Sequence, residues 1–133
     1  MDYVGLLKDY NLKVTPQRLD IVDILYKKGH VNIDDLFLSL KNRFPSLSLA
    51  TVYKNIKIMC DKLFLSEVKI PNQKNVYELT KKEHSHVICT KCETIMDIEL
   101  DTSSLLNKAK EISDFTLTKS SIILNGLCPQ CIN

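Results

Sequence analysis

The sequence predicts an α+β protein in which an N-terminal winged helix-turn-helix domain precedes a small C-terminal α/β domain. Apolar residues recur at helical spacing to about residue 62, and their period then changes to two. The last third mixes strand and helix patterns around two C-x-x-C pairs. A chain of 133 residues suffices for two small domains. We place them at 1–80 and 84–133, because the polar segment TKKE at 80–83 is suited to a hinge.

Two helices are expected before residue 30. Residues 3–10 favour a short amphipathic helix. A second helix should begin at Thr15-Pro16, because a capping hydroxyl followed by proline at the first helical position favours a helix start. Gly29 is expected to end it. Its inward-facing residues are predicted to be Leu19, Val22 and Leu25 or Tyr26.

Two further helices complete the helix-turn-helix pattern. The third is expected to follow Asn32 and to end before Pro45, and the fourth to run from about Ser48 to about Lys62. Both keep the apolar spacing of a helix with one buried face. The predicted inward residues are Ile33, Leu36, Phe37, Leu40 and Phe44 in the third helix, and Val52, Ile56, Met59, Cys60 and Leu63 in the fourth.

Alternating apolar residues predict the strands. Residues 68–70 and 76–79 flank the turn-forming sequence PNQKN and therefore predict a hairpin, which is the wing. The last third is expected to contain strands at 84–89 and 94–100, a helix at about 102–113 and a strand at 115–124. A domain of only about 50 residues needs a metal ion or a second copy to be stable.

Composition excludes several classes of protein. Hydrophobic residues make up 44% and charged residues 26%, a globular mixture that disfavours a disordered chain. No apolar run is long enough to span a bilayer, and the N-terminus lacks a signal pattern, so we expect a cytoplasmic protein without membrane contact. Residues 1–70 carry eleven Lys and Arg against eight Asp and Glu, which permits nucleic-acid binding without proving it.

The cysteines predict a structural zinc site. Cys89-x-x-Cys92 and Cys128-x-x-Cys131 are separated by 35 residues, and two such turns can place four thiolates tetrahedrally around Zn(II). A redox dithiol or unrelated buried thiols are the alternative interpretations. Cys60 occupies an apolar helix position and is expected to be a buried core thiol.

The three histidines suggest a second, exchangeable metal site. In a strand, the imidazoles of His84 and His86 would share one face, whereas Cys89 has the opposite parity. Glu78 and Asp97 are possible oxygen donors, and His30 lies far away in the sequence. Nitrogen and oxygen donors without sulfur suit Fe(II), Mn(II), Zn(II) or Co(II). Spacing alone leaves open that these are surface histidines and solvated carboxylates.

The fourth predicted helix has the character of a recognition helix. Its outward positions include Thr51, Tyr53, Lys54 and Lys57, and such side chains suit phosphates and thymine methyl groups in a major groove. Charge alone favours an ordinary solvated helix face instead.

Four segments together resemble the ferric uptake regulator (Fur) family. They are LKVTPQRLDIVDIL at 12–25, SLATVYKNI at 48–56, HSHVICTKCE at 84–93 and the terminal CPQC at 128–131. They occur in the family's order and span nearly the whole chain. The resemblance implies a homodimeric, metal-dependent repressor with an N-terminal winged helix-turn-helix and a C-terminal dimerisation domain.

The resemblance also implies roles for individual residues. It implies structural zinc at the four paired cysteines and a regulatory Fe(II) or Mn(II) ion between the domains. The regulatory ligands would be His30, Glu78, His84, His86 and Asp97. An A/T-rich palindromic DNA operator would be contacted by Lys13, Gln17, Arg18, Ser48, Thr51, Tyr53, Lys54 and Lys57, with Lys13 reaching into the minor groove.

Two carboxylates indicate to which branch of the family the chain is most similar. Asp97 resembles the peroxide-sensing branch, in which an iron-dependent reaction oxidises a histidine ligand, whereas Glu78 resembles the iron-sensing branch. We favour a peroxide-responsive repressor, with an iron-responsive repressor of iron-uptake genes or a zinc sensor as alternatives. A metal-dependent hydrolase is the competing class, but the chain offers no general base beyond the proposed ligands.

Overall fold

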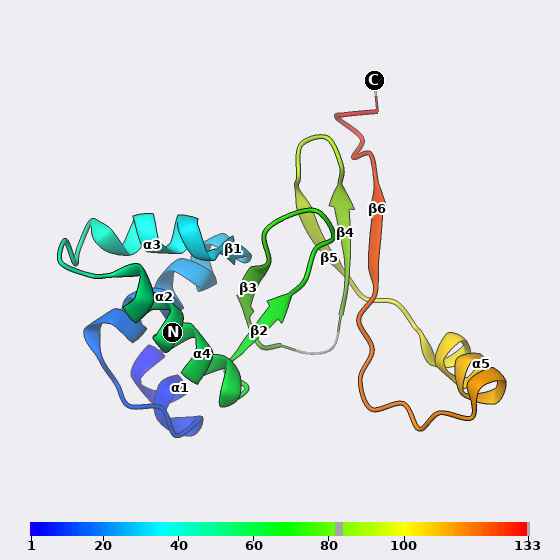
Figure 1. Cartoon of the computed structure of the whole chain (residues 1–133), viewed down its shortest axis with the longest axis horizontal. Coiled ribbons are helices and arrows are strands. Elements are labelled where there is room, and N and C mark those ends of the chain that lie inside the picture. The colour runs from blue at the N-terminus through cyan, green and yellow to red at the C-terminus, as the bar shows by residue number, and fades with distance from the viewer. Residues whose placement is uncertain (82–83, 133) are drawn as a thin grey trace. The chain divides into compact units, whose positions relative to one another are not determined.

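The computed structural model describes residues 1–81 and 84–132, and its chain divides into two compact units, Met1–Lys81 and Lys82–Asn133 (Figure 1). The division falls within the expected hinge, of which Lys82 and Glu83 lie outside the described residues. Among the residues that the structure describes, no helix has the length and apolar character needed to cross a membrane.

The first unit contains the four expected helices. Thr15, Asn32 and Ser48 act as N-caps, each accepting a hydrogen bond from the backbone N–H three residues later. Gly29 ends the second helix with a φ of +84°, a conformation that glycine adopts without strain. The helices are α1 (Tyr3–Asp9), α2 (Pro16–Lys28), α3 (Ile33–Lys41) and α4 (Leu49–Asp61).

One apolar core holds these helices together. The predicted faces of α3 and α4 supply fully buried Leu36, Leu40, Val52 and Met59. The prediction for Leu63 is wrong, because this side chain is 71% exposed. It directly follows the C-cap of α4 with a φ of +63°, and this left-handed turn directs the side chain away from the buried face.

A three-stranded antiparallel sheet forms the wing. Its strands are β1 (Val31–Asn32), β2 (Leu65–Val68) and β3 (Val76–Leu79), in the order β1-β3-β2. The sequence predicts the first strand of the hairpin at 68–70, but β2 begins three residues earlier and ends at Val68. The chain enters the sheet directly after α4, Leu65 pairs with Leu79, and the pairing ends at Val68 opposite Val76, before Pro71, which has no N–H to donate.

In the described part of the second unit, residues 84–132, the chain forms a sheet and one helix. The elements are β4 (Ser85–Cys89), β5 (Ile95–Ile98), α5 (Ser103–Ser113) and β6 (Ile123–Gly126), with strand order β5-β4-β6. The predicted strand at 115–124 is mostly wrong. β6 runs parallel to β4 from His86 opposite Ile123 to Cys89 opposite Gly126. The crossover that parallel strands require contains β5 and α5, and residues 115–122 are its last part, between α5 and β6.

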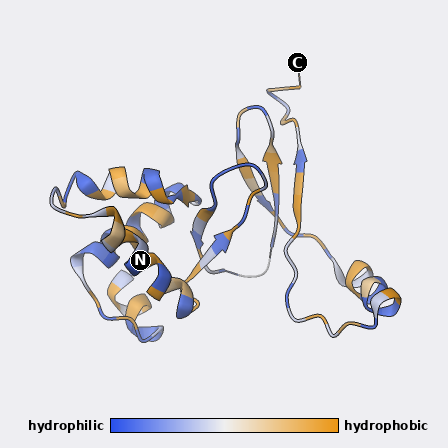
Figure 2. Ribbon diagram, in the orientation of Figure 1, coloured by the Kyte–Doolittle hydropathy of each residue, from blue (hydrophilic) through white to orange (hydrophobic). Residues whose placement is uncertain are grey.

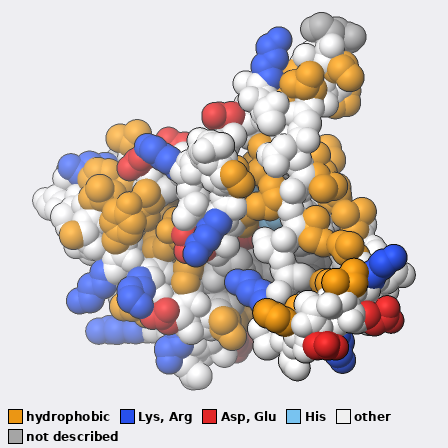
Figure 3. Space-filling model, turned by 45° about the vertical axis from the view of Figure 1, so that its right-hand side comes forward, with side chains coloured by type: hydrophobic (Ala, Val, Ile, Leu, Met, Phe, Trp, Pro, Cys, Tyr) orange, Lys and Arg blue, Asp and Glu red, His pale blue; other side chains and the backbone are white. Residues whose placement is uncertain are grey.

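Helix α5 is amphipathic but has no buried residue within the chain. Figure 2 shows hydrophobic and hydrophilic residues alternating around it, and Figure 3 shows hydrophobic side chains gathered on the surface of this unit. Leu105, Ile112 and Phe115 are each at least 62% exposed. The apolar face of α5 is therefore not buried by any segment of the described chain.

Candidate metal centres and nucleic-acid interface

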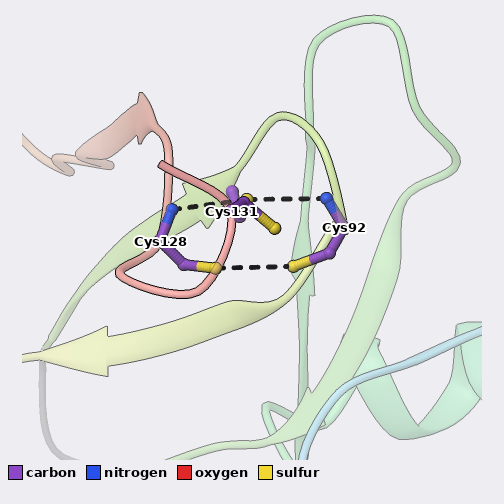
Figure 4. A group of neighbouring side chains, drawn as sticks. Cys92, Cys128 and Cys131 are labelled. Carbon is purple, nitrogen blue, oxygen red and sulfur yellow. Dashed lines mark hydrogen bonds between the residues drawn. The ribbon is translucent and has the colours of Figure 1, made fainter. Parts of the chain in front are cut away.

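The four paired cysteines form one cluster at the edge of the second unit. β4 ends at Cys89, its turn carries Cys92, and Cys128 and Cys131 lie in the turn after β6. Because β4 and β6 are neighbours, the two turns meet, and the four sulfur atoms all lie within 4.8 Å of one another. Figure 4 shows Cys92 and Cys128 facing each other, with their sulfur atoms 3.8 Å apart.

The cluster is electrostatically prepared for a cation. Backbone N–H groups of Cys92 and Cys128 donate to Cys89 Sγ and lower the pKa of this thiol to about 6. A hydrogen bond with Thr94 lowers the pKa of Cys92. The hydrogen bond with Cys128, together with burial and the other two thiols, raises the pKa of Cys131 to about 12. Four crowded thiols cannot all ionise unless a cation joins them, and four sulfur donors suit Zn(II).

The second unit also holds a group of nitrogen and oxygen donors. His86 on β4 lies opposite Asp97 on β5, so their side chains share one face of the sheet. His86 Nε2 lies 3.4 Å from Asp97 Oδ1 and 3.1 Å from His84 Nε2, and His84 Nε2 lies 3.7 Å from the same carboxylate oxygen. Both imidazoles are largely removed from solvent.

The first unit contains a separate pair of such donors. His30 follows the C-cap of α2, and Glu78 lies on β3. His30 Nε2 is 2.8 Å from Glu78 Oε2, and the Glu78 side chain is 2% exposed. Burial of a carboxylate is costly without positive charge nearby, and Lys81 Nζ lies 4.0 Å from the same oxygen.

The exposed face of α4 carries most of the predicted DNA contacts. Thr51, Tyr53, Lys54 and Lys57 are all exposed there, and Figure 3 shows Lys and Arg side chains grouped over the helical unit. Ser48 caps this helix, and its hydroxyl lies 2.9 Å from that of Thr51. An exposed helix with hydroxyl, phenol and ammonium groups suits a major groove.

The predicted contacts on the other side of the helix-turn-helix differ in exposure. Lys13 is exposed in the loop before α2, and Gln17 is half-buried. Arg18 is buried, and its guanidinium donates to the Lys13 carbonyl and to the Asn55 side chain of α4. Asn55, and Thr94 beside Cys92, could not be predicted as part of these sites, because no periodicity or motif marks either residue.

Comparison with known proteins identifies the family of the chain. The family model of the ferric uptake regulator family matches residues 9–125. The peroxide-responsive repressor PerR of Staphylococcus epidermidis is 28% identical over 96% of this chain and 87% of its own length.

Two solved structures are similar over almost the whole chain. The Campylobacter jejuni peroxide stress regulator is 35% identical, covers 98% of this chain and 100% of its own, and has a TM-score of 0.71. The Vibrio cholerae ferric uptake regulator is 27% identical over 96% of this chain and 100% of its own, with a TM-score of 0.76. These similarities confirm the predicted fold class and exclude the hydrolase alternative. The chain therefore belongs to the ferric uptake regulator family of dimeric, DNA-binding transcription regulators.

Proposed function

We propose that this protein is a homodimeric, peroxide-responsive repressor in the cytoplasm that binds operator DNA while a regulatory metal ion is bound. The observation that carries this proposal is that each unit contributes buried or half-buried donors of the same chemical kind. These are His30 and Glu78 in the first unit and His84, His86 and Asp97 in the second. Nitrogen and oxygen donors of this kind suit Fe(II) or Mn(II).

In this proposal, one ion joins the two groups of donors and acts as a clasp between the domains. A ligand shifts a conformational equilibrium only if it binds one conformer better. Only the conformer in which all five side chains converge offers the complete donor set. This conformer would hold the two DNA-binding domains of the dimer at the spacing of successive major grooves. Reciprocity requires that operator DNA tighten binding of the regulatory metal by the same factor.

The DNA contacts are assigned to the exposed side chains of the helix-turn-helix. Lys54 and Lys57 neutralise phosphates, and Thr51 and Tyr53 contact base edges or thymine methyl groups in the major groove. Lys13 enters the adjacent minor groove, which A/T-rich DNA makes narrow and strongly negative. Gln17 and Ser48 lie beside a hollow that Arg43 and Thr51 also line, next to the start of α4.

Structural Zn(II) is assigned to the four clustered cysteines. The ion would join the turn after β4 to the turn after β6 and thereby fasten the end of the chain to the sheet. Such a site supplies folding free energy that a unit of this size cannot obtain from its own core.

The peroxide response is assigned to the imidazoles. Fe(II) held by these residues would supply the electron transfer that activates peroxide, which Mn(II) does not readily perform. In the net reaction, one peroxide oxygen would be added to an imidazole carbon, and the ring hydrogen would leave with the other oxygen as water. His30 and His84 are the side chains that we expect to be oxidised, because they would lie next to the ion. An oxidised imidazole binds a metal ion less well, so the clasp opens and the operator is released. Asp97 and the peroxide-responsive relatives favour this branch.

An iron-responsive repressor is the second candidate, and Glu78 favours it. Operator binding with Fe(II) and with Mn(II), each before and after a low dose of peroxide, separates the two. A peroxide-responsive repressor should lose DNA only in the Fe(II) sample, whereas DNA binding that persists in both samples supports the iron-responsive branch. No metal-dependent DNA binding in any sample would reject both.

A further inference from the structure

Arg18 differs from the other predicted DNA contacts because its side chain is turned into the protein. It lies in the first turn of α2 and is 9% exposed. Its Nε donates to Asn55 Oδ1 at 3.1 Å, and its Nη1 donates to the Lys13 carbonyl at 2.9 Å. One guanidinium therefore contacts both the loop before α2 and the recognition helix α4.

The Asn55 side chain is held from both ends. Its Oδ1 accepts from Arg18, and its Nδ2 donates to the Thr51 carbonyl one turn earlier in α4 at 3.2 Å. These bonds fix the orientation of the amide on the side of α4 next to the exposed Lys54. The contact between Arg18 and Asn55 therefore acts on the helix backbone and not only on one mobile side chain.

We propose that Arg18 is a positioning residue that fixes the Lys13 loop and α4 relative to each other, so that both reach the operator in one register. This rests on the proposed DNA contacts of Lys13 and α4. Arginine suits the role because its planar group donates from Nε and Nη1 in two fixed directions. A lysine has a single ammonium group and cannot reproduce both bonds with the same geometry.

The consequence concerns specificity more than general affinity for DNA. Phosphate contacts from mobile lysines tolerate small displacements, because their attraction is long-ranged and independent of sequence. Contacts with base edges require fixed geometry. Release of α4 from the Lys13 loop should therefore weaken binding to an operator and leave binding to random DNA nearly unchanged.

The test uses full-length, metal-loaded Arg18→Lys and Asn55→Ala proteins. The first variant keeps the positive charge but not the planar donor group, and the second removes the amide that accepts the hydrogen bond. The probes are a duplex selected by the wild-type protein from a random library and a random duplex of equal length, each measured over a range of salt concentrations. Both variants should bind the selected duplex about tenfold more weakly. Affinity for random DNA and the salt dependence should stay at wild-type values. The double variant should be no weaker than the weaker single variant.

Lys54→Ala is the matched control for a direct phosphate contact and should lower the salt slope by about one on both duplexes. The same slope change in an Arg18→Met protein would mean that Arg18 itself contacts DNA, which overturns the proposal. If Arg18→Lys and Asn55→Ala both bind the operator with wild-type affinity while Lys54→Ala is impaired, the positioning role of Arg18 is overturned and the proposed DNA-binding face stands. Wild-type binding by Lys54→Ala as well removes the proposed DNA-binding face and the positioning role together. If the Arg18 and Asn55 variants lose affinity for both duplexes to the same extent, the cause is loss of folded protein, and the positioning role of Arg18 is also overturned.

Discussion

His86 and Asp97 lie directly opposite each other on β4 and β5, and His86 Nε2 is 3.4 Å from Asp97 Oδ1. The pairing register of these two strands fixes the contact, because directly opposite residues of an antiparallel pair project their side chains to the same face. A carboxylate on this short side chain is held close to the imidazole without help from any loop. The length of the side chain at residue 97 therefore determines how closely its carboxylate oxygens can approach a metal ion.

Asp97→Glu is expected to retain metal-dependent DNA binding and to blunt the response to peroxide. The longer side chain can bind an ion through both oxygens and so close the coordination position that peroxide needs. In the wild-type protein with Fe(II), mass spectrometry should find one added oxygen atom on His30 or His84, and Asp97→Glu should reduce it. The Mn(II)-loaded wild-type protein is the control and should stay unmodified. Oxidised cysteines with unmodified histidines would instead favour the iron-responsive branch.

Cys92→Ser is expected to lose the structural zinc and to unfold the second unit. Structural zinc contributes about 10 kcal/mol or more of binding free energy, far more than a unit of this size gains from its own core. Zinc content by atomic absorption and dimer content by sedimentation should both fall. Cys60→Ser is the matched control, because Cys60 packs against the core of the first unit, where burial raises the pKa of its thiol. Full zinc occupancy in Cys92→Ser would contradict the assignment.

Lys54→Ala is expected to weaken operator binding and to reduce its salt slope by about one, because one phosphate contact is lost. Fluorescence anisotropy over a range of salt concentrations measures both quantities. Lys8→Ala is the control, since Lys8 is an exposed lysine on α1, outside the proposed DNA-binding face. Equal slopes for Lys54→Ala and wild type would remove Lys54 from the set of phosphate contacts.

Ile112→Asp is expected to weaken the dimer. This side chain is 77% exposed on α5, and a second copy of the chain is the expected cover for that apolar face. A charge in an apolar homodimer interface should raise the dissociation constant of the dimer at least about tenfold. Analytical ultracentrifugation checks this, with Glu111→Ala on the same helix as control. An unchanged dimer would place the interface elsewhere.

The sequence was most informative where a single local rule decides the structure. Thr15 caps its helix as predicted, and Asn32 and Ser48 stand where the next two helices were expected to begin, because a side-chain oxygen beside a free N–H needs no tertiary context. The four paired cysteines cluster as expected from their spacing. The pairing of β4 with β6, which is a long-range contact, brings the two pairs together.

Long-range pairing and burial explain what the sequence did not predict. The limits of β2 and β6 follow from their partner strands, which local alternation does not specify. The resemblance implied a DNA contact for Arg18, and only the folded arrangement of α2 and α4 removes its side chain from solvent. No sequence pattern marks Asn55 as a partner of Arg18, because its role depends on that same arrangement of α2 and α4.

His30→Ala tests whether a regulatory metal ion joins the two domains to permit DNA binding. Structural zinc and dimer content are measured first, and binding to the selected duplex is then followed during titration with Mn(II), with Lys28→Ala as control. We expect a folded, zinc-containing dimer whose DNA binding no longer responds to Mn(II), because the first domain has lost its imidazole donor. Metal-activated DNA binding at the wild-type level in His30→Ala would contradict this role of the metal ion.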